Sequence, residues 1–203
     1  TEDVQQFVKA RLTQPVQGVR EGPRQKPLPD FSQFGEVVFE PLSRIRRVSA
    51  KNLEHSWQTI PQVTHFDEAD ITDLETFRAG LNAALAPGDI KISPLAFVMK
   101  AVIQALKKYP RFNASIDPEY EHWVVKRFYN IGIAVETPNG LVVPNVKSAD
   151  LQSIAALARS AAELAELARN KKLLPGQMQG TTFTISSLGG IGGTGFTPIC
   201  LLY

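Results

Sequence analysis

The stretch that most limits the possible folds is SPLAFVMKAVIQALKKY, residues 93–109. Ser93 can cap a helix and Pro94 suits the first helical position, so this pair predicts where a helix starts. The helix that follows is apolar on most of its sides. Such a helix is stable only when other elements cover it. The chain must therefore build further layers around this segment, and we expect it in the core.

Three further helices are expected on either side of this one. A long amphipathic pattern over residues 150–173 predicts a helix opened by Ser148. The pattern Thr72–Glu75 is typical of a capping box, in which the threonine and glutamate side chains satisfy the first free amides of a helix. Another helix is expected to start at Ser43 and to end near Pro61.

The remaining regular segments are short and rich in residues that favour strands. Helices and strands occur in clusters rather than in strict alternation, which predicts an α+β fold or an α/β sandwich with a mixed sheet. The sequence Thr137–Gly140 reads as a tight hairpin turn, because Asn-Gly tolerates the positive φ that such turns require. The expected strands are residues 36–40, 62–71, 112–116, 122–125, 129–136, 141–146 and 181–186.

Composition excludes several classes of function. The chain has 22 basic and 20 acidic residues among 203, spread along its length, so no nucleic-acid partner is implied. Its single cysteine, Cys200, allows neither an internal disulfide nor a cysteine-rich metal site, and no two histidines have metal-ligand spacing. No apolar run is long enough to span a membrane. We expect a soluble intracellular protein with no metal.

Several side chains are candidates for chemistry, each with a plainer alternative. Ser186 and Ser187 end the last expected strand, where a hydroxyl could donate to an oxyanion or simply bond to a neighbouring backbone. Arg78 could meet a phosphate or form a surface ion pair, as could Lys100 and Lys147. The other candidates are His55, His65, His122 and Cys200, each more typical of a packed or satisfied side chain, and a glycine pattern over residues 190–195 that no helix follows.

Four ordered segments carry a resemblance to a known family. They are SRIRRVSAKNL, IPQVTHFDEADITDLE, NIGIAVETPNGLVVPNVK and MQGTTFTISSLGGIGGTGFTPI. In this order they resemble the catalytic domain of the dihydrolipoamide acyltransferases of 2-oxo acid dehydrogenase complexes, from about residue 36 to residue 199. The amino-acid sequences of the second and fourth segments are similar to those of the acetyl-transferring members of this family, which belong to the pyruvate dehydrogenase complex.

The resemblance implies a domain order and an assembly. Residues 1–12 look like the last helix of a peripheral-subunit-binding domain, residues 13–35 like a Pro/Gly-rich linker, and residues 36–203 like a partial catalytic domain. The implied fold is the two-layer sandwich of chloramphenicol acetyltransferase with a mixed sheet, incomplete at the C-terminus. Trimers would place active sites between subunits and build a larger core, in bacterial cytoplasm or the mitochondrial matrix. Further implied partners are a lipoyl domain and, through the upstream binding domain, the decarboxylase and dihydrolipoamide dehydrogenase components.

The resemblance also implies site residues and substrates. Coenzyme A would enter from one side and dihydrolipoamide, the lipoyl group carried on a separate domain, from the other. Ser186 is the implied oxyanion donor, with Ser187 as a neighbour that holds the strand end, and Arg78 is the implied partner of coenzyme A phosphates. The implied proton acceptor is a histidine in an Asp-His-Arg signature.

The sequence departs from this family at one point. None of its three histidines lies between Asp and Arg. After Ile199 the sequence no longer follows the family pattern and continues as CLLY. We therefore expect an altered or truncated ending, exposed apolar strand edges and a chain that is inactive as it stands. One alternative is an inactive scaffold that only self-associates or binds coenzyme A. Another is an antibiotic-modifying acetyltransferase, for which the linker would have no use.

Overall fold

The computed structural model describes residues 27–189 and 192–200. The helix expected at residues 1–12 and most of the expected linker lie outside these residues. The chain divides into two units, residues 1–41 and 42–203. Nowhere in the described part of the chain is a helix long and apolar enough to cross a membrane.

The described part of the first unit holds a single 3₁₀ turn, η1 (Phe31–Gln33). Asp30 caps this turn by accepting hydrogen bonds from the amide and the hydroxyl of Ser32, at 3.0 and 2.6 Å. The strand expected at residues 36–40 is wrong, because this segment forms neither strand nor helix and Phe39 is 94% exposed. A strand needs a hydrogen-bonded neighbour, and the apolar pattern alone does not supply one.

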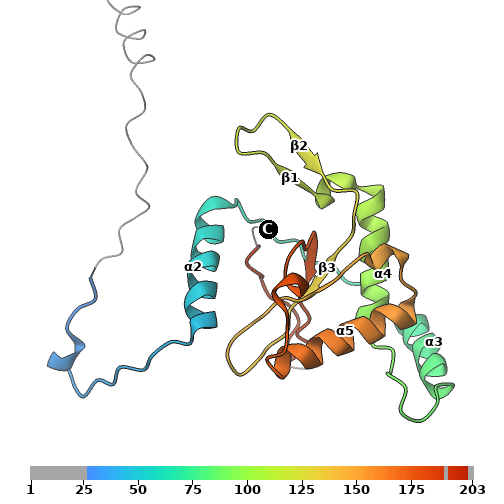
Figure 1. Cartoon of the computed structure of the whole chain (residues 1–203), viewed down its shortest axis with the longest axis horizontal. Coiled ribbons are helices and arrows are strands. Elements are labelled where there is room, and N and C mark those ends of the chain that lie inside the picture. Colours follow the sequence, from blue (N-terminus) through green and yellow to red (C-terminus); the bar gives the residue numbers. More distant parts are fainter. Residues whose placement is uncertain (1–26, 190–191, 201–203) are drawn as a thin grey trace, which may run out of the picture. The chain divides into compact units, whose positions relative to one another are not determined.

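The second unit mixes helices with short strands, which confirms the expected mixed α/β class (Figure 1). Its longest elements are the helices, and its strands have two or three residues each. The helices are α2 (Arg44–Thr59), α3 (Thr72–Ala83), α4 (Pro94–Lys108) and α5 (Ile154–Arg169). The strands are β1 (Ala114–Ile116), β2 (Trp123–Val125), β3 (Ile131–Ile133), β4 (Asn145–Val146) and β5 (Phe183–Ile185). The 3₁₀ turns are η2 (Pro110–Asn113), η3 (Ala149–Leu151) and η4 (Pro175–Gln177).

The core lies where α4 and α5 pack together against the strands (Figure 1). Met99 and Ile103 on α4, Leu157 on α5 and Ile131 on β3 are fully buried there. The predicted start of α4 at Ser93–Pro94 is confirmed, and this helix does contribute to the core. It is buried along one face rather than on most sides, since Val98 remains 44% exposed.

The strands form a mixed three-stranded sheet and a separate hairpin. In the sheet, of order β4-β3-β5, the central strand runs antiparallel to β4 and parallel to β5. The hairpin pairs β1 with β2 in antiparallel register and projects from the helices (Figure 1). The hairpin turn predicted at Thr137–Gly140 is confirmed. Gly140 has a φ of 126° and donates its amide to the carbonyl of Thr137, next to a bridge between Val135 and Val142.

One predicted strand and two predicted helix starts are wrong. Residues 62–71 form no strand. The capping box of α3 is absent, because the Asp70 carboxylate accepts both the amide and the hydroxyl of Thr72 at 2.9 and 2.6 Å, which makes the threonine hydroxyl a donor. Helix α5 starts at Ile154, where the Ser153 hydroxyl accepts the Ala156 amide, and not at Ser148. At the starts of α3 and α5, a nearby polar residue takes the role that the sequence pattern assigned elsewhere.

Candidate functional site

Ser186 lies directly after β5, at the carboxyl end of the sheet. The parallel register pairs Ile133 with Ile185, and the amide of Ala134 donates to the carbonyl of Ile185 at 3.1 Å. Ser186 is half-buried, whereas Ser187 is exposed. No hydrogen bond from the Ser186 hydroxyl to another described residue is present, so this hydroxyl is available to a ligand.

The strand beside Ser186 is packed tightly on both faces. Ile131 and Ile133 are buried in the core, so by strand alternation Gly132 points to the opposite face. A Cβ at Gly132 would lie 2.7 Å from the Thr181 methyl and 2.9 Å from the Thr184 hydroxyl, closer than real Cβ contacts come. Glycine is therefore required for the close approach of β5 that fixes the position of Ser186. Sequence reasoning missed this residue, although a glycine between two isoleucines in a strand is a signal of close backbone approach.

The side chains of two asparagines, one of them buried, hold the chain that leads into β5. The Asn145 amide nitrogen donates to the Gln179 carbonyl at 2.9 Å and to the Thr181 hydroxyl at 3.1 Å. Asn130 donates its side-chain amide to the Gly180 carbonyl at 2.8 Å and accepts the Thr182 amide on its own carbonyl at 2.9 Å. The entry to β5 is thus anchored by side chains from β4 and from the residue before β3.

Arg78, the second predicted site residue, is held from two sides on α3. Its Nε donates to both carboxylate oxygens of Glu75 at 3.0 Å, and its Nη2 donates to Glu75 Oε2 at 2.6 Å. Its Nη1 donates to the carbonyl of Ile92 at 3.2 Å, outside the helix. A fork of this kind between guanidinium and carboxylate fixes the plane of the arginine head group.

This pair also shifts both protonation equilibria. The hydrogen bonds with Arg78 lower the pKa of the Glu75 carboxyl, and the same bonds raise the pKa of the Arg78 guanidinium. Both groups therefore stay charged at neutral pH. Among the described residues only one hydrogen of each Nη nitrogen has a partner, which leaves one N–H on Nη1 and one on Nη2. The side chain of Arg78 is 25% exposed, so solvent or a ligand can reach the guanidinium.

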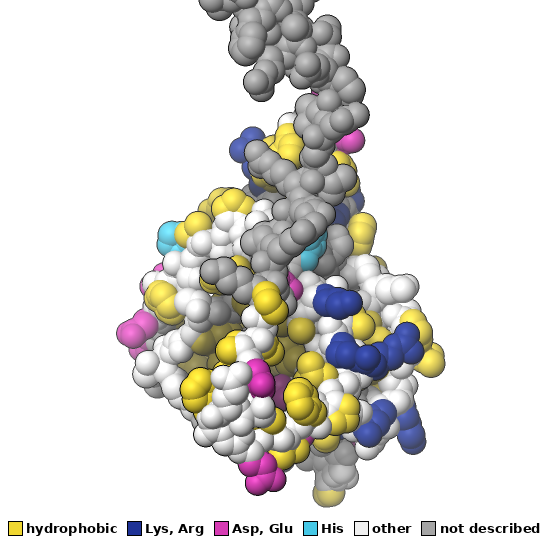
Figure 2. Space-filling model, turned by 90° about the vertical axis from the view of Figure 1, so that its left-hand side faces the viewer, with side chains coloured by type: hydrophobic (Ala, Val, Ile, Leu, Met, Phe, Trp, Pro, Cys, Tyr) yellow, Lys and Arg dark blue, Asp and Glu magenta, His cyan; other side chains and the backbone are white. Residues whose placement is uncertain are grey.

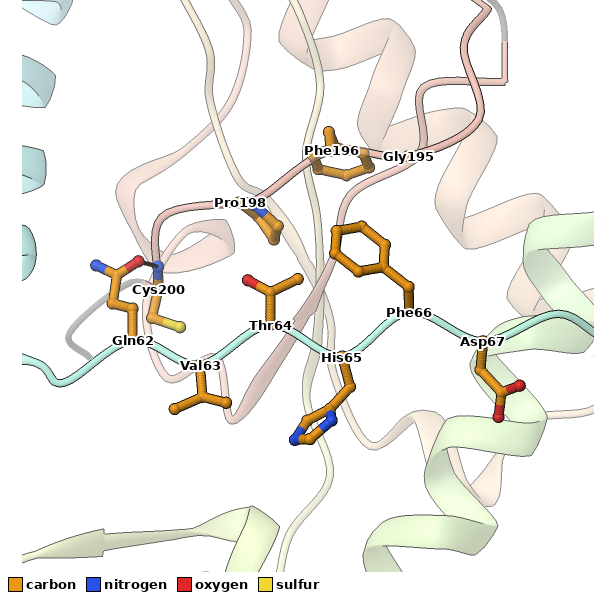
Figure 3. Close-up of a pocket in the computed structure, with 10 residues that line it drawn as sticks. All are labelled: Gln62, Val63, Thr64, His65, Phe66, Asp67, Gly195, Phe196, Pro198 and Cys200. Carbon is orange, nitrogen blue, oxygen red and sulfur yellow. Dashed lines mark hydrogen bonds between the residues drawn. The ribbon is translucent and has the colours of Figure 1, made fainter.

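A cavity of about 400 Å³ lies elsewhere in the same unit, between two extended segments (Figure 3). One segment runs from Gln62 to Asp67, and the other from Gly195 to Cys200. The segments are joined by a hydrogen bond of 3.4 Å from the Cys200 amide to the Gln62 side chain. Neither Ser186 nor Arg78 lines this cavity, and within the described chain no hydrogen bond joins those two residues.

The histidines are separated from one another. His122 bonds to Asp117 at 2.7 Å in the loop of the projecting hairpin, and His55 lies 3.5 Å from the Thr59 hydroxyl on α2. His65 lines the cavity, as does the exposed Cys200. The described residues contain no group of three or more side chains suited to holding a metal ion.

Comparison with known proteins decides the family. The model of the 2-oxoacid dehydrogenases acyltransferase (catalytic domain) matches residues 35–202. The chain belongs to this acyltransferase family. The match covers most of the chain and includes both Ser186 and Arg78.

Two curated relatives of the family carry the name dihydrolipoyllysine-residue acetyltransferase component of pyruvate dehydrogenase complex. The protein of Cupriavidus necator is 54% identical over 84% of this chain and 30% of its own length. That of Pseudomonas aeruginosa is 47% identical over 98% of this chain and 37% of its own length. The chain thus spans about a third of these relatives. Their names describe an enzyme and do not favour the inactive scaffold.

Two solved structures of the family have the same fold. One is a dihydrolipoamide acetyltransferase of Azotobacter vinelandii, studied for the roles of a serine, a histidine and an asparagine in its catalytic mechanism. It is 45% identical, with a TM-score of 0.85, over 88% of this chain and 74% of the other. The second is the cubic core of a pyruvate dehydrogenase multienzyme complex, with the same identity and TM-score, over 88% of this chain and 73% of the other.

Proposed function

We propose that this chain is the catalytic domain of an acyltransferase that moves an acetyl group between a dihydrolipoyl group and coenzyme A. The observation that carries the proposal is the hydroxyl of Ser186 at the carboxyl end of β5, which bonds to no other described residue, in a chain of this family. The names of the relatives support the acetyl group and the pyruvate dehydrogenase complex as the setting.

Acetyl transfer between two thiols requires a hydrogen-bond donor for the oxyanion that forms, and Ser186 can supply it. A base removes the proton from the thiol of the acceptor, and the thiolate forms a bond to the thioester carbonyl carbon. The carbonyl oxygen becomes an oxyanion, to which the Ser186 hydroxyl donates. The carbon–sulfur bond of the donor then breaks, and the proton passes to the departing thiolate. One such donor is worth about 3 kcal/mol of transition-state stabilisation.

Arg78 has the role of holding a phosphate group of coenzyme A in this proposal. Its support is the pair of unused N–H groups on the two Nη nitrogens and its partly exposed position. Guanidinium groups bind phosphates in this two-pronged way. The Glu75 carboxylate and the Ile92 carbonyl leave those two donors unoccupied.

We propose self-association into trimers and a larger core, and the two-layer sandwich of chloramphenicol acetyltransferase with a mixed sheet as the fold of the catalytic domain. Its support is the solved cubic core and the number of hydrophobic side chains on the surface, many of them visible in Figure 2. On the projecting hairpin, Ile116, Trp123 and Val124 are each about half exposed. Exposed apolar surface of this extent is typical of interfaces. The domain order proposed with this assembly keeps residues 13–35 as linker.

The experiment that tests the proposal is the transfer of acetyl from acetyl-coenzyme A to free dihydrolipoamide by this chain extended at its C-terminus with a family-type segment that carries the Asp-His-Arg signature. We expect Ser186→Ala to lower kcat about 10²- to 10³-fold with little change in KM. The matched control is Ser187→Ala, which alters the exposed neighbour and is expected to keep most of the activity. Equal rates for Ser186→Ala and the unaltered protein would remove this serine from the mechanism.

The proton acceptor is tested in the same assay with the 203-residue chain alone. We expect no transfer, because none of His55, His65 and His122 stands in the family signature. Transfer by this chain would make one of them the base. Exchange of each in turn for asparagine would then identify it.

A further inference from the structure

We propose that Glu75 and Asn82 are positioning residues for a phosphate group of coenzyme A, acting through Arg78. This inference rests on the proposed function, because it takes Arg78 as the phosphate-binding residue. Neither Glu75 nor Asn82 touches the ligand in the proposal. Their role is to hold the guanidinium of Arg78 in the orientation that binds.

Glu75 fixes one edge of the guanidinium. It lies three residues before Arg78 on α3, one turn away, and accepts hydrogen bonds from Nε and from Nη2. An arginine side chain loses considerable rotamer freedom when it is ordered, so an unrestrained Arg78 would have to be ordered by the ligand at the expense of affinity. The carboxylate orders it before the ligand arrives.

Asn82 fixes the other contact of the guanidinium, the carbonyl of Ile92. The Asn82 side chain donates to this carbonyl at 3.0 Å and accepts the Ile92 amide at 2.8 Å, which is the bonding pattern of a strand neighbour. Arg78 Nη1 donates to the same carbonyl. Because the Ile92 side chain is buried in the core, this carbonyl is tied both to α3 and to the hydrophobic interior.

These contacts select which donors remain for the ligand. With Nε and one hydrogen of each Nη nitrogen engaged, the remaining N–H groups are one on Nη1 and one on Nη2. Two neighbouring donors match two oxygens of one phosphate group. The arrangement thus predicts a contact with a phosphate and none with the phosphate-free pantetheine arm of coenzyme A.

Titration calorimetry on the assembled protein tests the inference, with coenzyme A and pantetheine as the two ligands. For coenzyme A we expect the Kd to rise about tenfold in Arg78→Gln and about three- to tenfold in Glu75→Gln. In the double variant we expect no more than the effect of Arg78→Gln, because Glu75 acts only through that residue. The Kd for pantetheine is expected to stay unchanged in all three variants.

Asp73→Asn is the matched control, since it removes one negative charge from the same helix at an exposed position. Loss of negative charge near a phosphate strengthens binding slightly, so a tighter Kd in both Asp73→Asn and Glu75→Gln would overturn the positioning role of Glu75. Asn82→Ala is expected to raise the Kd for coenzyme A about threefold. An equal loss for pantetheine would overturn the role of Asn82.

The phosphate-binding role of Arg78 and the positioning role of Glu75 can be contradicted separately. If Arg78→Gln binds coenzyme A as tightly as the unaltered protein does, the proposed role of Arg78 is wrong. If Arg78→Gln weakens binding while Glu75→Gln leaves it unchanged, Arg78 stands and the positioning role of Glu75 is wrong.

Discussion

The two candidate site residues are held by different means. Ser186 follows β5, which pairs with β3. All three residues of β3 are buried. Arg78 belongs to α3, a helix with no buried residue. The sheet positions its serine by packing, and the helix positions its arginine by polar contacts.

This difference matches the tasks that the two residues have in the proposal. An oxyanion donor must be placed to within a fraction of an ångström, and a tightly packed strand supplies that rigidity. A phosphate contact at the surface tolerates more movement and is set by charge and hydrogen bonds. Changes in packing should therefore disturb Ser186, and changes in polar side chains should disturb Arg78.

The largest contrast is expected between two glycines, Gly132 on β3 and Gly80 on α3. Gly132→Ala places a Cβ against short, stiff side chains at 2.7–2.9 Å and should lower the free energy of unfolding by about 1–3 kcal/mol. Gly80 has open space around its missing Cβ, so Gly80→Ala should raise it by about 0.5–1 kcal/mol. Chemical denaturation measures both. Two changes of the same sign would contradict the contrast between packed strand and open helix.

A smaller change in the free energy of unfolding is expected when a polar contact of α3 is removed. Asn82→Ala removes both hydrogen bonds to Ile92 and should lower the free energy of unfolding by about 1–2 kcal/mol, since each bond contributes about 1 kcal/mol. Asn52→Ala, at an exposed position of α2, is the control and should change it by less than about 0.5 kcal/mol. Equal denaturation midpoints for the two variants would show that α3 does not depend on this contact.

The same distinction explains which parts of the fold the sequence predicts. The start of α4 at Ser93–Pro94 and the turn at Gly140 follow from local chemistry, and both are confirmed. Residues 36–40 and 62–71 carry an equally good strand pattern and form no strand. A strand depends on a neighbour that is distant in sequence, so alternation predicts a preference and not an element.

The candidate site follows the same rule. The family resemblance predicts Ser186 and Arg78 as individual site residues. It does not predict the contacts that position them, because these contacts join residues far apart in sequence. Gly132 meets Thr181, and Arg78 meets the carbonyl of Ile92. Nothing in a local pattern marks these pairs, although the i,i+3 spacing of Glu75 and Arg78 could have suggested the ion pair.

The smallest effect is expected from the pH dependence of the Glu75–Arg78 pair. The hydrogen bonds with Arg78 hold the pKa of Glu75 below its ordinary value of 4.5, so the unfolded chain takes up this proton before the folded one does. The contribution of the pair to stability is therefore full above pH 4.5 and is lost as the pH falls through the lower folded value. Partial exposure keeps the contribution small.

Thermal unfolding at pH 7 and at a pH well below 4.5 measures this contribution. At pH 7 we expect a lower Tm for Glu75→Gln than for the unaltered protein, and in acid we expect the two to converge, because a protonated glutamate no longer pairs with Arg78. Asp73→Asn again controls for the loss of a charge from α3. A difference in Tm that is the same at both pH values would mean that Glu75 stabilises the helix by its shape rather than by its charge. The contrast with the packed strand would then be weaker than the hydrogen bonds suggest.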